Sequence, residues 1–193
     1  MSTQAQRWLT PQEYLSLERQ AQGKSEYLNG EMFAMSGASR KHNLICVNIA
    51  AAFHTQLRQL PCEVYTGDMR VKVNQTGLYT YPDVVVVCGG PQFEDTEVDT
   101  LLNPTLIVEV LSESTEDYDR GRKFEHYRTL TSLQEYLLVA QENFHITHYV
   151  RQPDDTWVLS DTLQTNAEIL LPSIHCRLVM AEVYAKVSIQ TPQ

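Results

Sequence analysis

The sequence predicts an α/β fold, in which a mixed β-sheet is flanked by helices on both faces and extra β-hairpins are added. Two apolar runs, 84–88 and 105–111, are continuous rather than alternating, which is typical of strands buried on both faces. A helix expected over 40–59 is apolar almost all round, as in a helix that covers a sheet. Helical and strand patterns mix along the chain without a repeat or linker, which indicates a layered sheet with helices on both sides.

The N-terminal half carries signals for a helix, a hairpin and a long buried helix. Thr10 and Glu13 have the spacing of a capping box, with Pro at the first helical position. Asn29-Gly30 between two strand-like runs is a strong signal for a β-hairpin. The elements expected here are a helix over 11–21, a hairpin over 25–35, a helix over 40–59 and a strand over 63–73.

The C-terminal half begins with the two buried strands and continues with mixed elements. Gly89-Gly90 ends the first of these strands, and an acidic, irregular segment separates it from the second. A turn around Pro153 separates two further strand-like runs. The elements expected here are strands over 83–88 and 105–111, a helix over 117–130, a strand over 134–140, a hairpin formed by 144–150 and 156–163, and a helix over 180–187.

Composition places the chain among ordinary globular proteins. Of its 193 residues, 42% are hydrophobic and 20% are charged, which excludes a disordered chain and fits one domain over 1–193. No apolar stretch is long enough to cross a membrane, and the first residues contain no signal core. Four separated cysteines are expected to be reduced, buried thiols, namely Cys46, Cys62, Cys88 and Cys176. We therefore expect a cytoplasmic protein without a membrane partner.

Net charge and missing motifs exclude several function classes. The formal net charge is −9, and Lys and Arg form no basic tract. Because phosphate binding usually requires a basic patch, this balance counts against a polyanionic partner, although a local positive groove can lie within an acidic total. The sequence contains no GxxxxGK[ST] loop, no Gly-x-Ser-x-Gly elbow and no HExxH pair. These absences argue against a P-loop nucleotidase, a serine hydrolase and a zinc peptidase of those types.

Two acids stand in or beside the strands that are expected to be buried. Glu109 lies in the middle of LIVEVL, and Asp83 stands at the start of the other buried run. An unpaired buried carboxylate costs several kcal/mol or takes up a proton, so such a group needs a partner. If the two strands are neighbours, both carboxylates can meet and share Mg²⁺ or Mn²⁺, which prefer oxygen ligands. Alternatively, Asp83 caps a turn and Glu109 forms a buried pair with Arg or Lys.

Further polar residues are candidates for the same site. Lys123 shares a helix face with Phe124 and Tyr127, so its ammonium group can reach Glu109. The alternative is an exposed pair with Asp119, which would contribute only about 0.3–0.5 kcal/mol. His42 at the start of the buried helix and Glu26 beside the hairpin are possible accessory residues. Each of them also has an ordinary explanation, as a local cap or a surface acid.

Taken together, these blocks resemble the Uma2 family, a group of restriction-endonuclease-like proteins within the PD-(D/E)XK nuclease superfamily. The resemblance is carried by Pro82-Asp83 with the following valines, by Ile107 to Ser112 and by Asp119 to Lys123. It implies a restriction-endonuclease-like three-layer core. Residue by residue, Asp83 matches the D element and Glu109 matches the (D/E) element. The motif lysine should stand at 111, where this chain has Leu111.

The family resemblance implies that a lysine from the following helix replaces the missing one. Lys123 matches that position, and Lys72 is a second candidate. The implied activity is Mg²⁺- or Mn²⁺-dependent hydrolysis of phosphodiester bonds, with DNA as the partner and a homodimer as the assembly. Asp83 and Glu109 would hold the metal, and Lys123 would orient water or stabilise charge. The alternatives are an inactive nuclease-fold binding module and a phosphodiesterase that acts on a smaller substrate.

Overall fold

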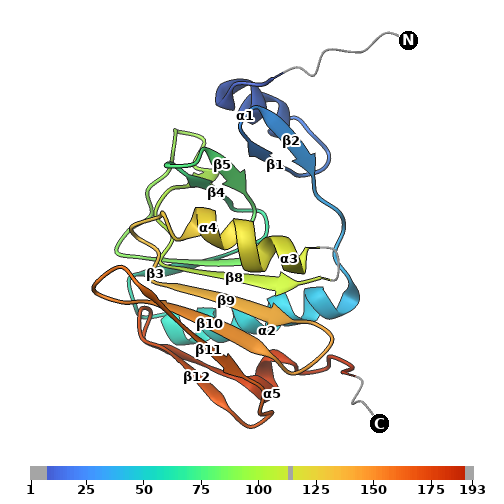
Figure 1. Ribbon diagram of the computed structural model, residues 1–193, viewed down its shortest axis with the longest axis vertical. Coiled ribbons are helices and arrows are strands. Elements are labelled where there is room, and N and C mark those ends of the chain that lie inside the picture. The colour runs from blue at the N-terminus through green and yellow to red at the C-terminus, as the bar shows by residue number, and fades with distance from the viewer. Residues whose placement is uncertain (1–7, 113–114, 190–193) are drawn as a thin grey trace.

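The computed structural model describes residues 8–112 and 115–189, and a six-stranded sheet forms its centre (Figure 1). Its strands β8 and β9 run parallel, and its other neighbouring pairs are antiparallel. Every residue of β8 is buried, which confirms a strand covered on both faces within a mixed sheet. The strand order is β11 (Trp157–Thr162), β10 (Ile146–Arg151), β9 (Glu135–Ala140), β8 (Leu106–Leu111), β6 (Val84–Cys88) and β3 (Cys62–Thr66).

One face of this sheet is covered by the helix α2 (Arg40–Leu57). Ile49 and Phe53 of α2 belong to the same buried core as Val86 of the sheet. The side chain of Ser39 caps the helix by accepting a hydrogen bond from the backbone N–H of His42. This cap fixes the first turn of α2, which contains His42, at the N-terminal end of the helix.

The opposite face is covered by a helical segment in three parts. It consists of α3 (Glu116–Tyr118), the π-helix η1 (Asp119–Lys123) and α4 (Phe124–Tyr127). Tyr127 is fully buried in the core on this face, together with Val85 and Ile107. Helices therefore lie on both faces of the sheet, as the sequence predicts (Figure 1).

A second, five-stranded sheet packs against the segment that contains α4, and α1 (Pro11–Glu18) joins its outer end. The predicted hairpin is confirmed, with positive φ angles at Asn29 (49°) and Gly30 (93°) in its turn. The capping box of α1 is also confirmed. The strand order is β2 (Glu31–Ala34), β1 (Ser25–Leu28), β5 (Leu78–Thr80), β4 (Arg70–Val73) and β7 (Thr100–Leu101).

A small third sheet and a short helix complete the layer that contains α2. Strands β12 (Glu168–Leu171) and β13 (Cys176–Val179) pair antiparallel, and α5 (Met180–Val183) follows. Leu171 and Met180 are fully buried in the core that contains α2. Among the described residues, no helix is both long and apolar enough to span a membrane.

Several sequence predictions of elements were wrong in their bounds. The strand expected over 63–73 is two strands in different sheets. The chain turns after Thr66, where the backbone N–H of Met69 donates a hydrogen bond to the carbonyl oxygen of Thr66. The first helix ends at Glu18, and the last helix ends at Val183. The strands β5, β7, β12 and β13 were missed, since two to four residues carry too little pattern.

The expectation of four reduced thiols was wrong for two of the cysteines. Cys62 and Cys88 oppose each other in the antiparallel register of β3 and β6, and their Cα atoms lie 4.1 Å apart. The structure joins them in a disulfide, whereas Cys46 and Cys176 remain free. No local pattern predicts this pairing, because it depends on the register of β3 and β6, which brings together two cysteines 26 positions apart in sequence.

Candidate active site

The register of two central strands brings the predicted acids to the same position. Val84 of β6 pairs with Val108 of β8 in an antiparallel ladder. Asp83 precedes Val84 and Glu109 follows Val108, so the antiparallel register places Asp83 opposite Glu109. The expectation that these strands are neighbours is confirmed.

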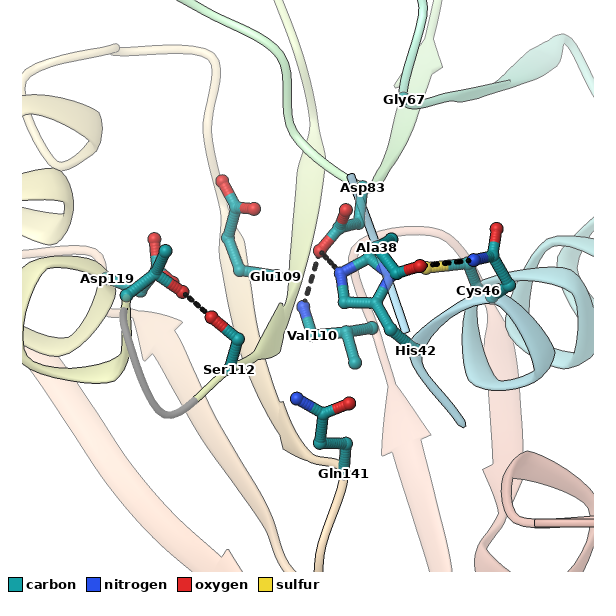
Figure 2. Close-up of polar contacts among 12 residues, drawn as sticks. Ala38, His42, Cys46, Gly67, Asp83, Glu109, Val110, Ser112, Asp119 and Gln141 are labelled. Carbon is teal, nitrogen blue, oxygen red and sulfur yellow. Dashed lines mark hydrogen bonds and ion pairs between the residues drawn. The ribbon is translucent and has the colours of Figure 1, made fainter. Parts of the chain in front are cut away.

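Asp83 is held in place by one of its two carboxylate oxygens. Its Oδ2 atom accepts a hydrogen bond of 2.7 Å from the backbone N–H of Val110 and lies 3.1 Å from His42 Nε2 (Figure 2). Among the described residues, none donates a hydrogen bond to Oδ1. Asp83 is thus oriented by the next strand and by α2, and one oxygen remains available.

Glu109 is arranged in a similar way on the face of the sheet that carries η1. Its Oε1 atom accepts a hydrogen bond of 2.8 Å from the hydroxyl group of Tyr127 and lies 3.0 Å from Lys123 Nζ. The side chain is almost fully buried, and no donor to Oε2 is found within the described parts of the chain. Glu109 therefore also keeps one oxygen uncommitted.

Lys123 is a buried ammonium group that joins three acids. Its Nζ atom lies 3.0 Å from Glu109, 3.2 Å from Glu26 and 3.3 Å from Asp119. The sequence offered the contact with Glu109 and the pair with Asp119 as alternatives, but the structure contains both. The pair with Asp119 is buried rather than exposed, so the weak surface pair was the wrong expectation.

The π-helix explains how one helical segment directs both charged groups toward the sheet. η1 spans Asp119 to Lys123, and both of these side chains are buried beneath it. A π turn holds more residues than an α turn and so changes which side chains share a face; such turns are frequent at functional sites. Sequence reasoning treated Asp119 only as a partner of Lys123 and missed it as a member of the site.

Negative charge exceeds positive charge in this cluster, and burial together with the neighbouring charges shifts the pKa values of its members. Burial raises the pKa of Glu109 well above its usual value; Lys123 opposes this shift, whereas Asp119 and Asp83 add to it. Burial also raises the pKa of Asp119. Burial acts to lower the pKa of Lys123, but Glu109, Glu26 and Asp119 outweigh it and hold that pKa well above its usual value. Such perturbed groups are typical of functional sites.

These groups line a pocket of about 610 Å³ between the central sheet and the β1–β2 hairpin. Phe33 and Met35 form an apolar wall on the hairpin side, and the exposed fraction of Phe33 is 50%. A second pocket, of about 460 Å³, is lined by uncharged side chains around Asn74 and Asn103. The first pocket is lined by Glu26, His42, Asp83, Glu109, Asp119 and Lys123, so it is the candidate active site.

Lys72 is the one predicted candidate that the structure does not bring to the pocket. It lies on β4, where its Nζ atom pairs with Glu94 beneath Tyr79. Glu94 and Lys72 are both absent from the pocket lining. Lys123 is therefore the candidate that stands in for the lysine missing at position 111.

The carboxylate oxygens available in the pocket are suitable ligands for a hard divalent cation. Asp83 and Glu109 face each other across paired strands, and each has a carboxylate oxygen without a donor among the residues that the structure describes. Oxygen ligands and excess negative charge favour Mg²⁺ or Mn²⁺. The residues present therefore fit the metal that the sequence resemblance implies.

Comparisons with known proteins identify the family and the fold of this chain. The family model described as "Uma2: Putative restriction endonuclease" matches residues 11–181. The uncharacterized Synechocystis proteins sll1609 and slr1290 are 39% and 36% identical over 161 and 176 residues; these matches cover 83% and 91% of this chain and 91% of each relative. A crystal structure described as "a putative nuclease belonging to DUF820", from Anabaena variabilis, has a TM-score of 0.74 at 17% identity and covers 93% of this chain and 99% of its own. That structure confirms the predicted fold class.

Proposed function

This chain belongs to the Uma2 family, and from that membership and the geometry of its pocket we propose that it is a metal-dependent endonuclease acting on DNA. The observation that carries the proposal is the position of Lys123, whose Nζ atom lies 3.0 Å from Glu109 at the point where Glu109 faces Asp83. An acid pair with an adjacent ammonium group is the arrangement expected for hydrolysis of a phosphodiester.

In this proposal, Asp83 and Glu109 hold Mg²⁺ or Mn²⁺ through their uncommitted oxygens. The bound ion would polarise the phosphate and lower the pKa of a bound water. Val110 and His42 orient Asp83, and Tyr127 orients Glu109 through the hydrogen bonds described above. These supporting contacts matter because misplaced ligands lower metal affinity by about 10- to 100-fold.

Lys123 would stabilise the charge that develops on the phosphate. The oxygen of the attacking water bonds to phosphorus while the bond to the leaving sugar oxygen breaks, and that oxygen then takes up a proton. Glu26 and Asp119 keep the ammonium group charged and fix its position. Removing one such electrostatic donor typically lowers the rate by about 10²- to 10³-fold.

A phosphodiesterase for a smaller substrate is the second candidate. The pocket is lined by Glu26, Asp83, Glu109 and Asp119 against Lys24 and Lys123, and the chain carries a net charge of −9. This acidic lining repels a long polyanion unless a cation is bound. The apolar wall with Phe33 suits one or two nucleotides, whose bases can stack on an aromatic side chain.

The proposal is tested by incubating the purified protein with supercoiled plasmid and Mg²⁺ or Mn²⁺. We expect nicking or linearisation by the wild type, and at least about a 10²-fold loss in Lys123→Met and Glu109→Gln. Glu135→Gln is the matched control, because Glu135 is a buried glutamate on the neighbouring strand β9 that pairs with His148 away from the pocket. Cutting that persists in Glu109→Gln contradicts the proposal and points to a contaminant.

The same variants separate the two candidate substrates. A short single-stranded oligonucleotide and a dinucleotide are offered beside the plasmid under identical conditions. Cleavage of the short substrates alone, lost in Glu109→Gln and kept in Glu135→Gln, would replace the endonuclease proposal with the second candidate. Binding of DNA without any cleavage would support the inactive binding module instead.

A further inference from the structure

Asp83, His42 and Cys46 lie in a row from the pocket toward the core beside α2, and each carries an atom that can bind a metal ion. His42 Nε2 lies 3.1 Å from Asp83 Oδ2 (Figure 2). Cys46 Sγ lies 3.5 Å from His42 Nδ1. His42 and Cys46 are one turn apart on α2, so their side chains lie on the same face of the helix. Asp83 reaches them from the start of β6.

The three side chains have the composition and proximity of a transition-metal site. One ligand atom from each of His42, Cys46 and Asp83 can be chosen so that all three lie within 4.8 Å of one another, which holds for no other such group among the described residues. A thiolate, an imidazole and a carboxylate together suit Zn²⁺ and related ions, whereas Mg²⁺ avoids sulfur. Three protein ligands leave a fourth position open, and His42 and Asp83 both face the pocket.

The same line of residues resembles a nucleophile with its base, but the surroundings argue against that role. Cys46 does not line the pocket, and it packs against the core beneath α2. Burial raises the pKa of the Cys46 thiol, and the Asp83 and Glu109 carboxylates raise it further. Without a cation, Cys46 is therefore a protonated, poorly accessible thiol and not an activated nucleophile.

We propose that His42, Cys46 and Asp83 form a second metal site, which binds Zn²⁺ or a similar thiophilic divalent ion. On binding, the Cys46 thiol loses its proton to solvent, and the His42 ring turns so that one of its nitrogens faces the ion. This binding does not depend on any nuclease activity. If the proposed function also holds, the shared ligand Asp83 makes Zn²⁺ a competitor of the catalytic metal and therefore an inhibitor.

Cobalt absorption tests the site directly, because Co²⁺ substitutes for Zn²⁺ and a cobalt–thiolate bond gives a charge-transfer band. Cys62 and Cys88 are paired in a disulfide, so Cys46 and Cys176 are the free thiols available. We expect the band in the wild type and in the matched control Cys176→Ser, and its loss in Cys46→Ser. We also expect binding of Co²⁺ to weaken by more than about tenfold in His42→Ala. A wild type without the band, or a band that Cys46→Ser retains, overturns the proposal.

Thiol alkylation of the wild type keeps the test decisive if a variant fails to fold. The modified cysteines are identified by mass spectrometry with and without Zn²⁺. We expect Zn²⁺ to slow alkylation of Cys46 by at least about tenfold while the rate at Cys176 stays unchanged. Equal rates at Cys46 with and without Zn²⁺ contradict the site.

Competition is measured separately on the wild type. The rise in Tm that Mn²⁺ adds is compared without Zn²⁺ and with Zn²⁺ already bound, and we expect Zn²⁺ to reduce this rise. This reduction should disappear in Cys46→Ser. Because the cobalt spectrum and the alkylation rates need neither Mn²⁺ binding nor cleavage, failure of the proposed function leaves them intact. Failure of the zinc site likewise leaves plasmid cleavage unaffected.

Discussion

Two buried cations, Lys123 and Arg70, lie in networks of opposite electrostatic character. Arg70 on β4 donates to Thr100 Oγ1 at 3.0 Å and to the Tyr81 hydroxyl at 2.9 Å, and its Nη2 atom lies 2.9 Å from Asp99. Arg19 also binds Asp99, and its hydrogen bond lowers the pKa of that carboxyl. Around Lys123, by contrast, the pKa values of Glu109 and Asp119 are raised.

The difference shows in which network the acids are stabilised in their charged form. The acids around Arg70 and Arg19 are stabilised in their charged form, as expected of a structural network. The acids around Lys123 carry more charge than one ammonium group compensates, and Glu109 and its neighbour Asp83 each have one oxygen without a donor among the described residues. A divalent cation relieves that imbalance, so the comparison itself supports a metal site at Lys123 and none at Arg70.

Removal of the Arg70 cation is the prediction with the largest expected effect on stability. Arg70→Met removes buried hydrogen bonds to Thr100, Tyr81 and Asp99, at about 1 kcal/mol each, which should lower the free energy of unfolding by about 3 kcal/mol although Arg19 still binds Asp99. Urea denaturation measures this loss. Stabilisation by Mn²⁺ should remain in the variant, since the pocket is untouched; a loss below about 1 kcal/mol would contradict a structural network.

Addition of Mn²⁺ should stabilise the protein only through Asp83 and Glu109 beside Lys123. At a concentration of about 100 times the dissociation constant, Mn²⁺ should add about 2.7 kcal/mol to the free energy of unfolding of the wild type. Thermal melting measures this as a rise in Tm. Asp83→Asn and Glu109→Gln should abolish the rise, whereas Glu135→Gln should keep it. An equal rise in all four proteins would place the metal elsewhere.

Stability should depend on pH with opposite signs in the two networks. Because the pKa of Glu109 is raised above its usual 4.5, the folded protein binds protons more tightly there, and stability falls as the pH rises from 4.5 through the raised pKa. Because the pKa of Asp99 is lowered below its usual 3.8, its contribution is present above pH 3.8 and is lost as the pH falls through the lowered pKa.

Metal-free urea denaturation at a series of pH values checks both signs. Relative to the wild type, Glu109→Gln should become more stable as the pH rises above 4.5. The stability difference between the wild type and Asp99→Asn should shrink as the pH falls below 3.8. Parallel pH curves for the wild type and either variant would refute the sign assigned to that network.

Loss of a single tyrosine hydroxyl should have the smallest effect and should separate the networks by metal affinity. Tyr127→Phe removes the hydrogen bond to Glu109, and Tyr81→Phe removes the bonds to Arg70 and Glu18. Each change should cost about 1 kcal/mol of unfolding free energy. Calorimetric titration should show about 10-fold weaker Mn²⁺ binding in Tyr127→Phe and unchanged binding in Tyr81→Phe. Equal affinities would exclude an orienting role for Tyr127.

Much of the candidate site could be predicted from the sequence, because burial leaves a pattern in the chain. A glutamate inside a continuous apolar strand needs a partner, and this pattern predicts Glu109 together with Asp83, whereas Lys123 is favoured only through the Uma2 resemblance. The Uma2 resemblance then assigned a role to each. The homodimer, the metal and the cytoplasmic location stay predictions.

Other features depended on contacts that no local pattern records. The π turn that buries Asp119 together with Lys123 departs from the regular helical spacing that sequence reasoning assumes. The sequence left Glu26 open between an accessory site residue and a surface acid, and it meets Lys123 across 97 positions of sequence because the hairpin folds over the pocket. The line from Asp83 through His42 to Cys46 likewise arises from the packing of α2 beside β6.

The sequence by itself determined which segments are buried and which acids cannot remain there alone, because apolar runs and their exceptions are properties of the chain. The tertiary structure decided which of those acids face each other, which lysine reaches them and which cysteines pair. These outcomes follow from strand register and helix packing, and a shift of one residue in register turns every side chain to the opposite face of the sheet.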